Sequence, residues 1–429
     1  MRYLERAAEQ PLQAMLEWAR AVVLVGPRQA GKSTLARRIV KAKRGAQMLL
    51  LDDPGVLSRA QSDPRGFVAG HKGLVCIDEI QLAPELFRAI KLETDLDPAP
   101  GRFLLTGSAR LGALPALADA LVGRADIFEL LPFSRRELAH RPGETISAMF
   151  DDPRSLAAAP LADFDPSMVV TGGFPEPVSR AGGAASAAWH RAYAGTVARR
   201  AVSELGGVSS AEALERTLRA LAARVGGVLS IEGLARDLAV PPTTLRRHLD
   251  VLDGAYVLDL LPAWVTNAAS RLRKAPKVHL VDSGLAAALS GATVTRLQRD
   301  RAIFGPLLES FVVGELRRQA ILCEPPVAVH HFRSGQQHEI DVILERADGA
   351  IVALEVKAGS TVRSSDFAGI RYLQQRIGDR FIAGFVASLG ADSGSFGNDC
   401  YGIHISALWA TPDVPTRSAR SATSRPGAP

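Results

Sequence analysis

The residues with the clearest chemical signature lie near the N-terminus, in the segment GPRQAGKS. It fits the pattern G-x-x-x-x-G-K-[ST], in which glycines let backbone N–H groups wrap around the phosphates of a nucleotide without Cβ clashes. The lysine reaches the β- and γ-phosphates, and the next hydroxyl binds Mg²⁺. A strand-like run precedes the motif and a helix-like run follows it, so a helix N-terminus faces the anion. The predicted nucleotide-binding residues here are Gly26, Pro27, Arg28, Gln29, Ala30, Gly31, Lys32, Ser33 and Thr34.

Two acids follow the apolar run LVCI. Asp78, at the end of the predicted strand, is expected to bind Mg²⁺ together with Ser33, and Glu79 to align or deprotonate the attacking water. Binding of ATP requires only the first acid, so the second favours hydrolysis. The alternative is that both are surface acids at the end of a strand.

Small hydroxyl residues end a further apolar run, FLLTGS. Thr106 and Ser108 are therefore candidates to sense the γ-phosphate or orient water, and Ser108 is included in the predicted nucleotide site. A serine that caps the next helix would explain the same pattern. Arg110 and Arg124 follow and are candidates for an arginine finger, acting within the chain or on a neighbouring subunit, although surface arginines are common.

A second group of acids lies near the C-terminus. Period-two alternation places Glu355 and Lys357 on the same face of a strand, and Asp341 interrupts an earlier apolar strand. Two carboxylates and a lysine at a sheet edge suit metal-assisted hydrolysis. We expect Asp341 and Glu355 to bind Mg²⁺ or Mn²⁺, Lys357 to polarise the water, and Glu309 to complete the catalytic set from a helix. The alternative is an ion pair between Glu355 and Lys357 on a solvated strand.

Two regular patterns must position these residues. Near the N-terminus, continuously apolar runs predict buried strands of a parallel sheet; they are AVVLV, MLLLD, LVCID and RFLLTG. From about residue 303 the pattern predicts a helix, three strands, a helix and a strand, which would bring the C-terminal acids to one sheet.

A helix-turn-helix is predicted in the middle of the chain. Apolar residues at helical spacing mark residues 231–238 as one helix with Ser230 as its N-cap. After a short break, residues 243–252 form a second helix that leaves Arg246 and Arg247 outward, and residues 256–261 are predicted as a wing strand. Contact with a DNA backbone and a role in packing or protein docking both remain open.

Several segments together resemble the prokaryotic AAA+-type P-loop ATPases whose C-terminal half carries a domain of unknown function. They include GPRQAGKSTL, VCIDEIQLAPELF, FLLTGSARL, KVHLVDSGLAAAL and GPLLESFVVGELRRQ. The resemblance implies ATP binding and assigns no cellular role. The family carries an acid in the helical segment that reads RRAV here, and Ala201 occupies its place. The C-terminal region is similar to the PD-(D/E)XK nuclease superfamily in its order of elements and its D…ExK spacing.

The predicted fold class is α/β, with a P-loop NTPase parallel sheet of AAA+ type, a helical winged-helix region and an α/β restriction-endonuclease-like domain. The expected divisions are the ATPase domain at 1–140, a linker at 141–185, the helical region at 186–300, the nuclease-like domain at 301–410 and a disordered tail at 411–429. Pro- and Asp-rich composition marks the linker, and few apolar residues mark the tail.

The 429-residue composition limits the classes of function. Net charge is +6, which permits nucleic-acid binding without requiring it. Three well-separated cysteines include no CxxC, so neither a zinc site nor a disulfide framework is implied. The N-terminus is charged where a signal peptide is apolar, and no apolar run reaches the ~18 residues that span a bilayer. We expect a cytoplasmic protein with no membrane partner.

Two functions fit these features. The first is an ATP-hydrolysing protein, with ATP and Mg²⁺ as cofactors, that couples nucleotide turnover to DNA association through a winged helix and a nuclease-like domain. The second is a non-catalytic, nucleotide-switched regulator whose degenerate nuclease fold binds a protein partner or a second copy of the chain. A small-molecule kinase is a third interpretation, for which the sequence lacks a recognisable acceptor lid.

Overall fold

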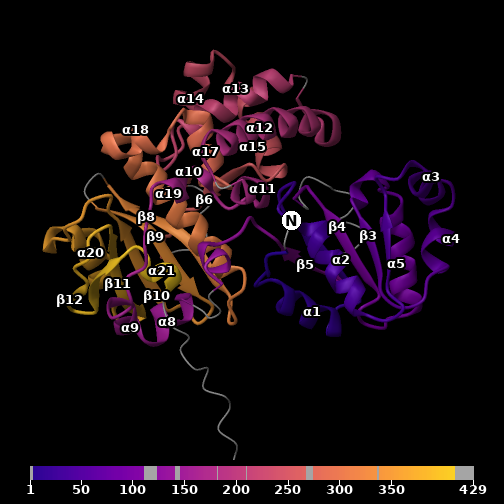
Figure 1. Cartoon of the computed structure of the whole chain (residues 1–429), viewed down its shortest axis with the longest axis horizontal. Helices are drawn as coiled ribbons and strands as arrows, with labels where there is room; N and C mark the ends of the chain where they lie inside the picture. Colours follow the sequence, from indigo (N-terminus) through magenta and orange to yellow (C-terminus); the bar gives the residue numbers. More distant parts are fainter. Residues whose placement is uncertain are drawn as a thin grey trace, which may run out of the picture.

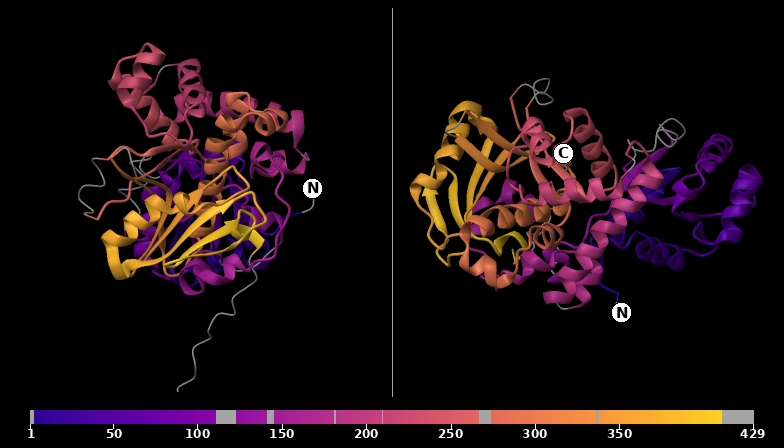
Figure 2. Two further views of the ribbon diagram at one scale, coloured as in Figure 1. Left: turned by 90° about the vertical axis from the view of Figure 1, so that its left-hand side faces the viewer. Right: turned by 90° about the horizontal axis from the view of Figure 1, so that it is seen from above.

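The computed structural model of the chain describes residues 3–110, 123–140, 145–180, 182–208, 210–266, 274–335 and 338–410. Figure 1 shows three successive parts: a parallel sheet with its helices, a group of helices, and a mixed sheet. Seen from above in Figure 2, the pink helices lie between the indigo and the yellow parts of the chain. The tail predicted as disordered, 411–429, lies outside the described residues.

The first part is a five-stranded parallel sheet in the order β2-β3-β4-β1-β5. Its strands are β1 (Ala21–Val25), β2 (Gln47–Leu50), β3 (Val75–Asp78), β4 (Phe103–Gly107) and β5 (Ala125–Glu129). Successive side chains of β1 enter two separate cores, Val23 on one face of the sheet and Leu24 on the other. Because both faces are covered, the strand reads as continuously apolar. The four predicted strands and the P-loop NTPase sheet are confirmed, and the edge strand β5 was not predicted.

Helices cover both faces of this sheet. They are α1 (Glu9–Trp18), α2 (Lys32–Ala42), α3 (Pro54–Ser62), α4 (Pro64–Ala69) and α5 (Leu86–Leu96), with a 3-10 turn η1 (Ile80–Leu82) after β3. Asp53 and Asp63 cap α3 and α4 by accepting backbone N–H groups, ahead of a proline in the first turn of each helix. The sequence thus starts both helices locally.

The structure differs from the linker predicted at 141–185. After α7 (Arg135–Leu138), the described part of this segment holds short helices, namely α8 (Thr145–Asp151), α9 (Pro153–Ala157), α10 (Ser167–Thr171) and α11 (Pro175–Ser179). Ile146 and Met149 of α8 are fully buried, and α8 packs against the C-terminal sheet. Each apolar group is too short to show a helical period, and the intervening Pro and Asp residues gave the segment the composition of a linker.

The second part is helical. Its helices are α12 (Gly183–Leu205), α13 (Ala211–Ala222), α14 (Ile231–Leu238), α15 (Pro242–Gly254), α17 (Ser283–Ser290) and α18 (Val294–Arg299). Strands β6 (Leu258–Leu261) and β7 (Lys277–Leu280) pair antiparallel. Ser230 caps α14 as predicted, accepting from the backbone N–H of Gly233. Arg246 and Arg247 of α15 are exposed, as the apolar spacing of that helix predicted.

The third part is a six-stranded sheet in the order β12-β13-β11-β10-β9-β8. It comprises α19 (Arg301–Ala320), β8 (Val327–Ser334), β9 (His338–Arg346), β10 (Ile351–Val356), η3 (Ser364–Phe367), α20 (Ala368–Ile377), η4 (Gly378–Arg380), β11 (Phe381–Ser388), β12 (Gly394–Gly397), β13 (Cys400–His404) and α21 (Ala407–Ala410). Strands β8, β9 and β10 form an antiparallel meander, and β11 pairs parallel to β10. The predicted succession of helix, three strands, helix and strand is confirmed.

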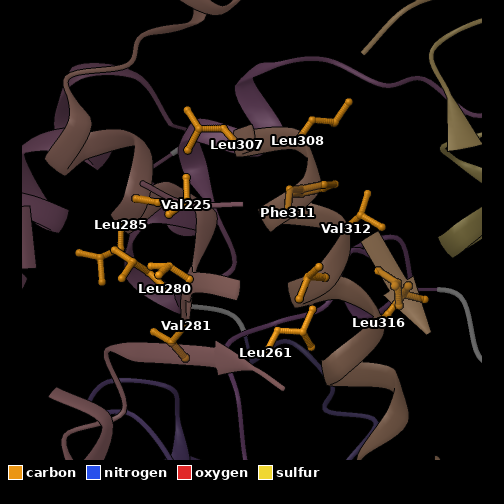
Figure 3. Close-up of a cluster of buried hydrophobic side chains, with 14 of the residues drawn as sticks. Val225, Leu261, Leu280, Val281, Leu285, Leu307, Leu308, Phe311, Val312 and Leu316 are labelled. Atoms are coloured by element: carbon orange, nitrogen blue, oxygen red, sulfur yellow. The ribbon is translucent and has the colours of Figure 1, made fainter. Parts of the chain in front are cut away.

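One hydrophobic core joins the second and third parts. Figure 3 shows Leu308, Phe311 and Val312 of α19 in this core, together with Leu285 of α17 and Leu280 of β7. The core extends to residues of β9, β10 and β11. The boundary predicted at residue 300 therefore runs through continuous packing. Among the described residues no helix is both long and apolar enough to cross a membrane.

Candidate functional site

The predicted phosphate loop connects the end of β1 to the start of α2, so its N–H groups lie at a helix N-terminus. Gly26 has φ +146°, and a Cβ there would collide with the carbonyl oxygen of Leu130. Gly31 has φ +101°. Both positions thus require glycine, as the motif predicted. All nine predicted phosphate-binding residues lie in this loop and the first turn of α2.

Lys32 occupies the inside of the loop. Its buried ammonium donates to the carbonyl oxygens of Gly26 and Pro27, at 2.8 Å each. Burial lowers the pKa of Lys32 to about 8. A bound phosphate would offset this desolvation, because an anion beside a buried ammonium favours its charged form.

The first acid after β3 lies beside the loop, as predicted. Asp78 accepts at Oδ1 from the Ser33 hydroxyl at 2.9 Å and from the Thr106 hydroxyl at 2.5 Å. Ser33 and Asp78 thus present adjacent oxygen donors from α2 and β3, the hard ligands that Mg²⁺ prefers. These residues fit a magnesium ion that arrives with a nucleotide. Thr106 donates a hydrogen bond to the Asp78 carboxylate, and this role was not predicted from the sequence.

The second acid has an unusual backbone. Glu79 has φ +57°, in the left-handed region that non-glycine residues uncommonly adopt and in which functional residues are often found. Its Oε2 accepts from the Ser108 hydroxyl at 3.1 Å and from the Gln81 side-chain amide. Thr106 accepts from the Glu79 backbone N–H at 3.1 Å. Ser108 therefore holds the carboxylate expected to orient water. The sequence analysis did not select Gln81, which lies in η1, because a single amide side chain carries no local signal.

A cleft of about 490 Å³ opens between the phosphate loop and α12. Lys32 and Glu79 line one side, and Trp189 and Tyr193 of α12 line the other. The two aromatic rings stack with centroids 5.0 Å apart. They supply the apolar surface that suits a nucleotide base, since every base has a π-face.

Two contacts connect the loop directly to α12. The Arg28 guanidinium donates to both carboxylate oxygens of Glu204, at 2.7 Å each. The Tyr193 hydroxyl donates to the Arg28 carbonyl at 3.2 Å. Ala201, where the resemblance implies an acid, is buried. The acid of this helix that contacts the loop is Glu204, three positions further on.

The two candidate arginine fingers are held elsewhere. Arg110 lies 3.2 Å from the Asp253 carboxylate, and its guanidinium lies over the Tyr256 ring. Arg124 pairs with Asp95 at 2.6 Å. Neither lines the cleft. Within one chain both arginines connect elements of the fold, and a role on a neighbouring subunit stays a prediction.

Arg6 supports the loop from behind and was missed. Its buried guanidinium donates to the carbonyl oxygens of Ala30 at 2.8 Å and Leu131 at 2.6 Å. It also pairs with Glu137 at 2.9 Å. A single arginine before the first helix gives no sequence signal, because its partners come from distant segments.

The C-terminal acids meet as predicted, around a residue that the sequence analysis did not select. Lys277 of β7 lies 2.8 Å from Glu309 of α19 and 2.9 Å from Asp341 of β9. Asp341 also accepts at Oδ2 from the backbone N–H of Val356, at 2.9 Å. The carboxylates are thus assembled, and an ammonium group lies among them.

The remaining pair of this cluster is Glu355 and Lys357, 2.8 Å apart. Burial, and then the charge of Asp341, raise the pKa of Glu355 to about 8. In the part of the chain that the structure describes, no group of three His, Cys, Asp or Glu side chains is placed to hold a metal ion. Asp341 and Glu355 are each paired with a lysine, Lys277 and Lys357, and metal binding by these two acids stays a prediction.

Three family models match the chain: an AAA domain over residues 19–139, a domain of unknown function (DUF8612) over 166–296, and a domain of unknown function (DUF4143) over 304–408. Uncharacterized proteins of Mycobacterium tuberculosis and Mycobacterium bovis are each 30% identical over 356 residues, which cover 83% of this chain and 74% of each relative.

Solved structures of motor and Walker-type proteins also match. The Walker-type ATPase of Pyrococcus abyssi is 17% identical, covers 67% of this chain and 96% of its own, and gives a TM-score of 0.41. The RuvB Holliday junction branch migration motor of Thermotoga maritima is 20% identical. The match covers 60% of this chain and 90% of that chain and gives a TM-score of 0.30.

The parallel sheet, the phosphate loop and the matching AAA domain define the class of the N-terminal part: residues 19–139 form an AAA-type P-loop ATPase domain. Within that class the chain belongs to the family of the two mycobacterial proteins. The predictions of an AAA-type ATPase and of ATP as its ligand are confirmed at this level. The winged-helix and nuclease-like identities stay predictions.

Proposed function

We propose that this protein hydrolyses ATP in the cleft between the phosphate loop and α12, and that the occupied loop changes how α12 is held. The observation that carries this proposal is the pair of contacts from Arg28 to α12. Arg28 also belongs to the loop that would enclose the phosphates. A change in the conformation of this loop would therefore act directly on its contacts with Glu204 and Tyr193 of α12.

Each residue has a separate role in this proposal. Lys32 binds the β- and γ-phosphates, and Ser33 and Asp78 hold the magnesium ion, which neutralises charge on the phosphates. Glu79 orients the attacking water or accepts its proton. Ser108 and Gln81 hold the Glu79 carboxylate in place.

DNA association is the second element of the proposal. Helices α13, α14 and α15 followed by the β6–β7 hairpin have the element order of a winged helix. Arg246 and Arg247 are exposed on α15 and are not bound to neighbouring acids by any ion pair that the structure describes. They are therefore available to contact phosphates of a nucleic acid backbone.

The C-terminal domain is proposed to act without cleaving DNA. The two functions considered from the sequence differ on this point. The ammonium of Lys277 among the acids supports the version with a degenerate nuclease fold. The domain then serves as a rigid platform, since it shares a core with the helical part.

The nucleotide proposal is tested by steady-state ATP hydrolysis and by ATP affinity. Lys32→Ala should abolish turnover. Arg28→Ala should leave turnover measurable and reduce the ATP-dependent change in protease sensitivity of α12, because it removes the ion pair with Glu204 and keeps the backbone carbonyl that accepts from Tyr193. Arg37→Ala, an exposed arginine of α2 outside the cleft, is the matched control. An ATP response of α12 that is undiminished in Arg28→Ala would contradict transmission through the ion pair between Arg28 and Glu204.

The DNA proposal is tested by fluorescence anisotropy with duplex DNA at several salt concentrations. The double variant Arg246→Ala/Arg247→Ala should weaken binding and reduce the salt slope by about two, since each lost phosphate contact lowers it by about one. The control is Arg59→Ala/Arg65→Ala, which removes the same charge from exposed positions on α3 and α4. Equal binding by both double variants would refute a DNA-binding role for α15.

A further inference from the structure

The acidic cluster of the C-terminal domain contains a buried lysine that comes from outside that domain. Lys277 lies on β7, in the helical part, and its side chain is 1% exposed. The acids lie on α19 and β9. A lysine is rarely buried to this degree unless it is paired, so its partners determine what it does.

The ammonium group has three partners. Its Nζ lies 2.8 Å from Glu309 Oε1, 2.8 Å from Glu339 Oε1 and 2.9 Å from Asp341 Oδ1. An ammonium carries three N–H donors and no acceptor. Its hydrogen-bonding capacity is therefore matched by three carboxylate oxygens from two elements of the fold.

The same oxygens are the ones that a divalent metal would require. A magnesium ion binds oxygens at about 2.0–2.1 Å in octahedral geometry and keeps several waters. Glu309 and Asp341 already direct one oxygen each to Nζ, and the second oxygen of Asp341 accepts from Val356 N–H. A metal here would lie against the positive charge of Lys277, whose side chain is buried.

We propose that Lys277 is the resident cation of this cluster, and that its ammonium takes the place that a divalent metal occupies in a hydrolytic site of this design. Lys277 also connects β7 to α19 and β9, so this cluster joins the helical part to the C-terminal sheet. The inference rests on the proposal that the C-terminal domain acts without cleaving DNA, and it is independent of the nucleotide proposal because none of these residues lines the cleft at the phosphate loop.

The test measures Mn²⁺ binding to the full-length, nucleotide-free protein by electron paramagnetic resonance, and the effect of Mn²⁺ on Tm. Lys277→Ala removes the ammonium and leaves room among the acids. This variant should bind one additional Mn²⁺ and show a rise in Tm on adding Mn²⁺. The double variant Lys277→Ala/Asp341→Asn should lose both effects. Lys357→Ala is the matched control, because it removes the other lysine of the cluster and leaves Lys277 in place.

Two outcomes would overturn the inference. One is a folded Lys277→Ala protein, checked by circular dichroism, that gains no Mn²⁺ site. The other outcome needs no Lys277 variant. It is found if the parent protein binds Mn²⁺ and the Asp341→Asn variant does not. If Lys277→Ala does not fold, this second comparison decides, and equal Mn²⁺ binding by the parent and Asp341→Asn supports the lysine as resident cation.

Discussion

We expect the substitution Glu79→Gln to separate ATP hydrolysis from ATP binding in this protein. The substitution removes the negative charge and the basic group while keeping the size of the side chain. The retained amide oxygen can still accept from the Ser108 hydroxyl, which donates to the Glu79 carboxylate at 3.1 Å. The left-handed backbone at this residue is unchanged, so we expect the side chain to stay in the cleft.

The size of the effect follows from the role assigned to the carboxylate. A positioned general base contributes roughly 10²–10⁴-fold to a rate, or about 3–5 kcal/mol of activation free energy. We therefore expect kcat to fall at least about 100-fold. ATP affinity should not weaken, because Lys32, Ser33 and Asp78 are untouched and a negative charge near the phosphates is removed.

The assay is steady-state phosphate release together with ATP binding by titration calorimetry. Glu85→Gln is the control, since this acid lies near Glu79 in sequence and does not line the cleft. A kcat within about tenfold of the parent would refute the role of Glu79 as the group that orients or deprotonates water. A matching loss of affinity would instead mean that the substitution had disturbed the loop.

Further predictions concern the loop and the shared core. ATP affinity should fall as pH rises through about 8, where the nucleotide-free Lys32 ammonium loses its proton, and calorimetry at several pH values should find this dependence absent in Lys32→Ala. Below that pH the buried charge costs stability, so the contribution of Lys32 to folding rises between pH 8 and its ordinary pKa, near 10.5. Gly26→Ala should abolish ATP binding in titration calorimetry, because the alanine Cβ would collide with the carbonyl oxygen of Leu130. Phe311→Ala should lower the free energy of unfolding by about 3–5 kcal/mol in denaturant titrations, since Phe311 is buried beside Phe164.

The parts of the fold that the sequence predicted are those with a strong local pattern. The strands β1, β3 and β4 are continuously apolar, and α14 and α15 show a clear helical period with a serine cap or a proline start. The helices between residues 145 and 180 escaped prediction because their apolar groups span only one or two turns. Their stability comes from tertiary packing, of α8 and α9 on the C-terminal sheet and of α10 and α11 on α12, and packing has no local signature.

The same distinction holds for the nucleotide site. Lys32, Ser33, Asp78 and Glu79 could be selected because their chemistry follows from residue type at fixed spacing next to a strand. Arg6 could not be selected, since its role depends on carbonyl groups of distant segments. The contact between Arg28 and Glu204 likewise joins residues 176 positions apart.

By itself, the sequence determined that a nucleotide is held, because a phosphate loop is built from consecutive residues whose backbone conformation is encoded by its glycines. It also indicated that Asp341 and Glu355 leave the apolar faces of their strands, because alternation along a strand fixes the face on which a side chain lies. Only the tertiary structure decided what lies among those acids. Lys277 is 32 positions from Glu309 and 64 from Asp341, and folding alone brings its ammonium within 3 Å of both carboxylates.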